Sequence, residues 1–374
     1  MAGVYVHLPF CPYVCPYCDF AKWPHRRSAA LRYLSALEAE IAAAPAFAAK
    51  TLFLGGGTPN VYPAADIARL VARLRTRFSL GSAAEVTIEL NPDLSLCEEF
   101  AAYVEAGINR FSFGVQSFVD AELAALGRQH RGGEVVAAVD RARIAGVSNL
   151  SVDLMFGIPG QTVDSWKGSL AAALELEPHH VSTYGLTIEA GTPFSVWHAR
   201  EPAAFPDADR EAELFSVAID RLEAAGFEHY EISNFARPGF RSHHNANYWA
   251  NGPYLGLGVG AASYLDGTRS VHTRAIDAYC DAALGGSPIP GTSEHLEGAA
   301  RTGEAAMLAL RTSQGVDVAS FAERYGIDFL RFYEPVLAEM SAAGVLEVNP
   351  AVVRLTRRGR FLANDVCAAF IAPA

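Results

Sequence analysis

The sequence predicts an α/β protein: a partial barrel of the (β/α)6 type, followed by a C-terminal winged-helix-like α+β domain. Short runs of β-branched and apolar residues recur at regular intervals, and amphipathic segments with apolar residues three to four apart lie between them. Strands that alternate with helices in this way pair in parallel through right-handed crossovers. Six to seven such units are too few for a closed eightfold barrel, so the barrel is expected to stay open.

The strands and helices of the predicted barrel follow one another in order along the chain. Each strand is a short run of β-branched, aromatic or aliphatic residues, and each helix carries its charges opposite its apolar face. The strands are expected at Val4–Leu8, Lys50–Leu54, Glu85–Leu90, Arg110–Val115, Asn149–Phe156, His180–Leu186 and His229–Ile232. The helices are expected at Leu31–Ile41, Ala65–Phe78, Glu98–Glu105, Glu134–Ala145, Ser165–Leu176 and Arg210–Ala225.

Two further parts follow the barrel, which is assigned to residues 1–233. Residues 234–290 are expected to bridge, because Asn234–Gly267 is rich in Gly, Asn and aromatic residues and Pro288–Gly291 is typical of a linker. Residues 291–374 are expected to form the winged-helix-like domain. Its helices and hairpin strands are expected at Ala299–Thr312, Val318–Tyr325, Phe329–Ala343, Leu346–Asn349 and Val352–Thr356.

The charge balance of the sequence limits the classes of partner that the protein can bind. The 30 Lys and Arg against 41 Asp and Glu give a net charge of −11, so no basic field is available for a nucleic-acid backbone. The winged-helix-like tail is therefore interpreted as a packing or lid domain rather than a DNA reader. The start lacks the features of a signal peptide, and no apolar run is long enough to span a membrane. A cytoplasmic location is expected, and six cysteines without a paired framework agree with a reducing compartment.

Cys11, Cys15 and Cys18 form a C-x3-C-x2-C motif directly after the first predicted strand. Thiolates this close can converge on one metal centre, and their softness selects an iron–sulfur cluster or zinc. Most clusters use four cysteines, but the other three cysteines of the chain are scattered. The motif therefore indicates a cluster with one iron open to a small-molecule ligand. The alternatives are zinc, which favours a closed four-ligand shell, and a disulfide, which would leave an odd thiol.

Unusual residues follow the other predicted strands and are expected to meet at one mouth, because ligands collect at the carboxyl ends of parallel strands. The run GGGTP follows the second strand, where glycines let the backbone approach a ligand. Glu89 and Asp153 end the third and fifth strands and can accept hydrogen bonds from an ammonium or a ribose. Gln116 and Arg128 add an amide and a guanidinium. Each residue alone fits a cap, a salt bridge or a solvated side chain equally well, so the inference rests on their joint order.

The chain resembles, from Tyr5 to about Ile371, the family of oxygen-independent coproporphyrinogen III oxidase-like proteins of the radical S-adenosylmethionine (SAM) superfamily. The resemblance is carried by YVHLPFCPYVCPYCDF, FLGGGTP, TIELNP, FSFGVQSF, LGRQH and DLMFGIPGQT. It implies a radical SAM barrel in which the three cysteines hold a [4Fe-4S] cluster whose open iron chelates SAM. By the family pattern, contacts with SAM fall on Tyr5, Tyr17, Gly56, Gly57, Thr58, Glu89, Gln116, Arg128 and Asp153.

Three features resemble the haem chaperones of this family rather than its true oxidases. The oxidases have a fourth cysteine two positions after the third, where this sequence has Phe20, and they usually carry a longer N-terminal extension. The segment HNANYW resembles the HNxxYW motif to which haem binding by these chaperones is attributed. It offers His244 as an axial ligand of haem iron and Tyr248 and Trp249 as stacking rings. A histidine among aromatic residues is also often structural, and His243 is a substitute ligand.

Three functions follow from these observations. The leading hypothesis is a haem chaperone that binds haem and delivers it to an unidentified acceptor protein, with a [4Fe-4S] cluster and SAM on its barrel; it need not turn over, and no catalytic residue is assigned. Transient membrane association through a partner stays open. The alternative is a coproporphyrinogen oxidase, in which SAM cleavage yields a deoxyadenosyl radical that abstracts hydrogen from substrate propionates. A DNA-binding regulator is disfavoured by the net charge.

Overall fold

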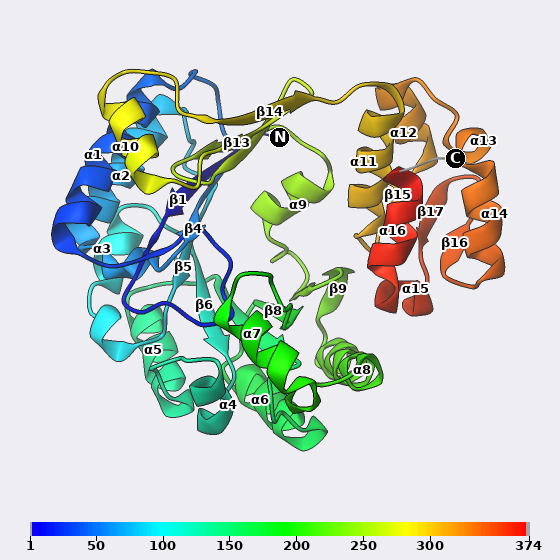
Figure 1. Cartoon of the computed structure of the whole chain (residues 1–374), viewed down its shortest axis with the longest axis horizontal. Coiled ribbons are helices and arrows are strands. Elements are labelled where there is room, and N and C mark those ends of the chain that lie inside the picture. Colours follow the sequence, from blue (N-terminus) through cyan, green and yellow to red (C-terminus); the bar gives the residue numbers. More distant parts are fainter. Residues whose placement is uncertain (1, 372–374) are drawn as a thin grey trace.

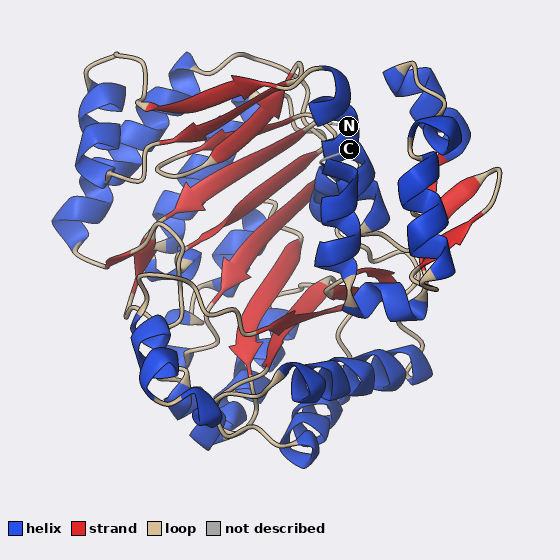
Figure 2. Cartoon of the chain, turned by 45° about the vertical axis from the view of Figure 1, so that its right-hand side comes forward, coloured by secondary structure: helices blue, strands red, loops and turns tan. Residues whose placement is uncertain are grey.

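The computed structural model describes residues 2–371, and most of its strands belong to one twelve-stranded sheet (Figures 1 and 2). The strand order is β14-β13-β12-β11-β1-β4-β5-β6-β7-β8-β10-β9. Its six central strands are parallel, which confirms the predicted α/β barrel. These strands are β1 (Gly3–Leu8), β4 (Thr51–Gly56), β5 (Glu85–Leu90), β6 (Arg110–Gln116), β7 (Leu150–Phe156) and β8 (His180–Gly185).

The seventh predicted strand forms, but it does not extend the parallel series. β9 (Glu228–Glu231) pairs antiparallel with β10 (Asn234–Ala236), which pairs antiparallel with β8. The connection between β9 and β10 is only two residues long, and a parallel crossover needs a dozen or more residues. The sheet therefore ends at this edge in a hairpin.

The six predicted barrel helices form and cover the outer face of the curved sheet (Figure 1). Val4, Val6 and Leu8 of β1 belong to the buried apolar core on this side, whereas the alternating residues Tyr5 and His7 lie on the other face. The inner face of the barrel is therefore free to carry polar residues. The barrel helices, with two that the sequence pattern missed (α4 and α7), are α1 (Arg27–Ala43), α2 (Ala64–Arg77), α3 (Phe100–Glu105), α4 (Asp120–Ala125), α5 (Gly132–Ile144), α6 (Val163–Glu175), α7 (Pro193–Arg200) and α8 (Ala208–Ala224).

The expected bridging segment, residues 234–290, is built into the barrel sheet. β11 (Tyr254–Leu257) pairs in parallel with β1, and antiparallel strands continue the sheet beyond it. The short helix α9 (His243–Trp249) contacts both β4 and the C-terminal domain (Figure 1). The remaining elements of this segment are β12 (Ala262–Leu265), β13 (Thr268–His272) and α10 (Ile276–Leu284). β14 (Gly291–His295) lies beyond residue 290 but pairs with β13, so the barrel sheet continues past the expected boundary.

The C-terminal domain has the predicted helices and β-hairpin around a separate core that includes Leu310, Phe329 and Phe370. One predicted helix is split after Phe332, and Pro335 lies at the start of its second half, because proline lacks an N–H and favours the first helical turn. The elements are α11 (Gly298–Leu310), β15 (Val316–Asp317), α12 (Val318–Tyr325), α13 (Phe329–Phe332), α14 (Glu334–Ala342), β16 (Leu346–Val348), β17 (Val352–Leu355), α15 (Arg357–Phe361) and α16 (Ala363–Ile371).

Within residues 2–371, none of the helices combines the length and the apolar character needed to cross a lipid bilayer.

Candidate SAM and cluster site

A cavity of about 500 Å³ opens at the carboxyl ends of the parallel strands. All three motif cysteines line it, and so do eight of the nine residues expected to contact SAM. The ninth, Tyr5, is half-buried on the inner face of β1, where its hydroxyl is 2.9 Å from Nδ1 of His7. The structure therefore gathers residues from five strand ends into one space. The eight residues are Tyr17, Gly56, Gly57, Thr58, Glu89, Gln116, Arg128 and Asp153.

The cysteine loop is fixed by its own backbone. β2 (Phe10–Cys11) pairs with β3 (Trp23–Pro24), and the amide of Cys18 donates to the carbonyl of Cys15 at 3.2 Å. All three thiols are unpaired and half-buried, and burial raises the pKa of Cys11 to about 11. Among residues 2–371, no group of three or more His, Cys, Asp or Glu side chains is arranged to hold a single metal ion. Three thiols from one loop that line a cavity fit a cluster with an iron facing the cavity.

At the three glycines, the space that a side chain would fill is already occupied by other atoms of the site. A Cβ on Gly55 would lie 2.6 Å from the Glu89 carboxylate, and one on Gly56, whose φ is +105°, would lie 2.3 Å from the His7 ring. A Cβ on Gly57 would lie 2.6 Å from the carbonyl oxygen of Leu8. These glycines therefore let the second strand end pack directly against the cysteine loop and the acidic wall.

We expect Gly57→Ala to lower both the iron content and the affinity for SAM. The added methyl would meet backbone atoms of Leu8, Pro9 and Phe10 at 2.6–2.8 Å, so the cysteine loop must shift, and overpacking of this kind typically costs about 1–3 kcal/mol. Iron analysis after anaerobic reconstitution and equilibrium SAM binding measure the two effects. Gly168→Ala is the control, because a Cβ there meets nothing within 4 Å. Equal losses in both variants would contradict the explanation.

Glu89 and Asp153 form an acidic wall inside the barrel. Glu89 accepts a hydrogen bond from the amide of Gly56 at 2.9 Å, and Asp153 accepts from the hydroxyl of Ser112 at 3.1 Å. Burial raises the pKa of Glu89 to about 7, and the Asp153 charge adds to the rise while the Gly56 amide and the Arg110 charge oppose it. Burial also raises the pKa of Asp153. Two half-buried carboxyls that line one cavity and are costly to ionise there favour a cationic ligand beside them.

SAM affinity is expected to rise between pH 6 and pH 8. Glu89, with a pKa near 7 instead of 4.5, is mostly protonated at the lower pH and mostly ionised at the higher one, and only the carboxylate attracts the ammonium of SAM. Binding measured across this range tests the direction. Glu89→Gln should weaken SAM binding and flatten its pH dependence. If the Gln variant kept the wild-type pH dependence, a group other than Glu89 would be responsible for it.

Arg128 and Gln116 also line the cavity. Arg128 donates to the carbonyl of Gly114 at 2.7 Å and to Oδ1 of Asn91 at 3.2 Å. Asn91 also donates to the hydroxyl of Tyr13 at 3.1 Å, and the sequence reasoning missed both of these residues. Gln116 has a φ of +68°, which is strained for a non-glycine residue, and it follows a register shift in β6. The shift aims the amide at the cavity.

The residues expected to bind haem lie on another element, α9, outside this cavity. His244 is 1% exposed, and both ring nitrogens have partners: Nδ1 lies 2.8 Å from the hydroxyl of Thr51 and Nε2 lies 2.8 Å from that of Tyr248. Burial, with the charge of Arg110, lowers its pKa to about 3. The structure thus places His244 as a neutral, hydrogen-bonded ring against the sheet. Its neighbour His243 has an exposed side chain.

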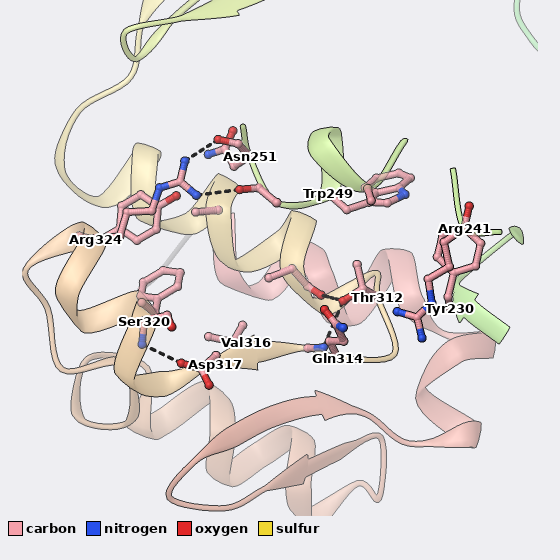
Figure 3. A pocket seen from close by; sticks show the side chains of 17 residues that line it. Tyr230, Arg241, Trp249, Asn251, Thr312, Gln314, Val316, Asp317, Ser320 and Arg324 are labelled. Atoms are coloured by element: carbon pink, nitrogen blue, oxygen red, sulfur yellow. Dashed lines mark hydrogen bonds between the residues drawn. The ribbon is translucent and has the colours of Figure 1, made fainter. Parts of the chain in front are cut away.

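Trp249 lines a second cavity of about 280 Å³, between α9 and the C-terminal domain (Figure 3). The guanidinium of Arg311 lies 5.5 Å from the centre of its ring, and its indole N–H is buried without a partner among the described residues. Arg241, Asn251 and Arg324 surround the same space. The HNANYW helix therefore faces the barrel with His244 and the C-terminal domain with Trp249.

Comparisons with known proteins agree with this architecture. A family model described as the Radical SAM superfamily matches residues 5–173, and one described as the HemN C-terminal domain matches residues 298–362. The solved structure of coproporphyrinogen III oxidase (HemN) from Escherichia coli superposes with a TM-score of 0.86, covering 100% of this chain and 90% of that one. The identity is 24%, so this likeness shows the fold alone.

Curated relatives are more similar in sequence. The chain is 37% identical to "Heme chaperone HemW" of Bacillus subtilis (strain 168), covering 99% of both proteins. It is 38% identical to the protein of the same name from Escherichia coli (strain K12), over 73% of this chain and 74% of that protein. Because one relative matches along almost its whole length, the chain belongs to the HemW family of radical SAM proteins.

Proposed function

We propose that the protein is a haem chaperone that carries a [4Fe-4S] cluster and SAM on its barrel, binds haem and delivers it to an acceptor protein. The observation that carries the proposal is the strand-end cavity, in which three unpaired cysteines and an acidic wall meet, in a chain that matches proteins named haem chaperones over its full length. The acceptor has to be a protein that needs haem. The expected cytoplasmic location and the transient membrane association through a partner stay predictions.

Each wall of the cavity has a role in holding the cofactors. Cys11, Cys15 and Cys18 would ligate the cluster, which when bound supplies one-electron chemistry toward SAM. Glu89, once ionised, would accept hydrogen bonds from the ammonium of SAM, and the Gly56–Thr58 backbone would lie along its methionine part. Tyr17 borders the same cavity, and its ring packs edge-on against Phe194 at 6.0 Å between centroids, so it can present a fixed aromatic face.

The haem ligand is proposed to be His243. A haem iron needs an imidazole nitrogen with a free lone pair, and the two nitrogens of His244 already pair with Thr51 and Tyr248. His243 is exposed. Ala246 and Ala250, which follow it by three and by seven residues, both line the second cavity, between α9 and the C-terminal domain. Residues at this spacing share one helix face, so His243 lies on the side of α9 that borders this cavity. His244 is the alternative ligand.

Coproporphyrinogen oxidation is the second candidate, because the oxidase has the same fold. Phe20 argues against it: it stands where the oxidases have a fourth cysteine, lines the cavity and is 64% exposed. Parallel assays on one anaerobic preparation separate the two functions. We expect haem uptake, seen as a Soret band, and no decarboxylation of coproporphyrinogen III with reductant and SAM. Sustained decarboxylation without haem uptake would reverse the assignment.

A further inference from the structure

The HNANYW helix, α9, is tied to the amino ends of β1, β4 and β5, whereas the proposed SAM site lies at the carboxyl ends of these strands. The carboxylate of Glu85 accepts hydrogen bonds from the backbone amides of His243 and His244 at 3.0 and 2.9 Å. Gly3 of β1 leaves the space that the His244 ring fills, since a Cβ there would lie 3.2 Å from that ring. Together with the Thr51 bond, these contacts fix the ring over β1 and β4.

Phe53 connects the fixed His244 ring to the SAM-binding residues. Its ring centre lies 5.2 Å from that of His244, with 31° between the planes, and 6.1 Å from that of Tyr5. Phe53 and Glu89 also border the same gap, because a Cβ on Gly55 would lie 2.8 Å from the edge of the Phe53 ring and 2.6 Å from the Glu89 carboxylate. The aromatic ring therefore has His244 on one side and two expected SAM contacts on the others.

We propose that α9 is a positioning element of the SAM site: His244 holds the Phe53 ring, which in turn sets the places of Tyr5 and Glu89. The Phe53 ring is half-buried and stands between these neighbours, and a ring that packs against them cannot tilt freely without moving them. The motif thereby joins the SAM cavity to the interdomain surface on which Trp249 lies. The inference rests on the proposed binding of SAM at Glu89.

The test compares two substitutions of Thr51 that differ in the hydroxyl. Thr51→Val keeps the shape but leaves Nδ1 of His244 without its partner, whereas Thr51→Ser keeps the partner. We expect Thr51→Val to raise the Kd for SAM about tenfold, the equivalent of about 1.4 kcal/mol and within reach of one lost buried hydrogen bond. Thr51→Ser should stay near wild type. The EPR signal of the reduced cluster, recorded with saturating SAM, should change in the Val variant alone.

Phe53→Leu and Tyr248→Phe extend the test along the same path, and both should weaken SAM binding while the iron content stays at the wild-type level. Asn245→Ala is the control on the same helix, since the Asn245 side chain makes no hydrogen bond within residues 2–371. Thermal unfolding of the reconstituted proteins identifies variants that fail to fold. If Phe53→Leu is one of them, SAM binding by the milder Tyr248→Phe variant decides the test.

Three outcomes are distinguishable. Weaker SAM binding in Thr51→Val, rescued in Thr51→Ser, supports the positioning role of α9. Equal SAM affinity in wild type, Thr51→Val and Phe53→Leu would overturn it and leave the SAM site in place. If the wild-type protein with an intact cluster bound no SAM, the proposed function itself would fail.

Discussion

Replacing Cys11, Cys15 and Cys18 together by alanine is expected to remove the whole iron–sulfur cluster, about four irons per chain. All three cysteines line one cavity and are unpaired, and their loop is held by backbone hydrogen bonds that do not need the thiols. The apoprotein should therefore stay folded while its iron, acid-labile sulfide and visible absorption disappear. Iron and sulfide analysis after anaerobic reconstitution measures the loss, and each single alanine variant should lose most of the cluster.

Cys280→Ala and Cys367→Ala are the matched controls. Both residues are buried, at 1% and 2% exposure, in apolar clusters on other elements, and each should keep the full iron content. Cys97→Ala should also keep it, although Cys97 lies closer to the site: its thiol contacts the carbonyl of Asn91, a residue of the cavity wall. A triple variant that retained iron and sulfide would show that the cluster has other ligands.

The central strands could be predicted from the sequence, because parallel strands buried on the outer side read as compact β-branched runs between amphipathic helices. The residues at the carboxyl ends of parallel strands necessarily lie at one edge of the sheet. For this reason eight of the nine expected SAM contacts share a cavity with the cysteines. The short strands β11 to β14 were missed. β11 pairs with β1 across some 250 residues of chain, and its Gly-rich sequence carries little strand signal of its own.

The roles of His243 and His244 could not be read from their order in the chain. Either imidazole could ligate haem iron, and only the docking of α9 on β4 decides which of the two rings is buried. That docking depends on Thr51, which is 193 residues away from His244 in sequence. Phe53 was overlooked for a similar reason, because an apolar residue in a strand predicts only core packing. Its contacts with Tyr5 and His244 appear only after the sheet is assembled.

His243→Ala is expected to remove the imidazole-ligated Soret band of the haem complex and to weaken haem binding. His243 is the exposed histidine of α9, whereas His244 has both nitrogens engaged. Loss of an outer-shell partner alone typically costs a metal site about 10- to 100-fold in affinity, and an axial ligand should cost at least as much. Haem titration of the anaerobic protein, followed by absorption and by EPR of the ferric form, measures affinity and ligation together.

His244→Ala is the contrasting variant on the adjacent residue. If its ring supports Phe53 and the sheet, the substitution should leave the haem spectrum close to wild type and act on SAM binding instead. Trp249→Ala should reduce haem affinity with a smaller spectral change, because this ring can supply packing but no ligand. The opposite pattern, with the Soret band lost in His244→Ala and kept in His243→Ala, would require α9 to release His244 from Thr51 and Tyr248 when haem binds. In that case the His244 ring could not ligate haem and support the SAM site at the same time. Adding haem should then weaken SAM binding by the same factor as SAM weakens haem binding.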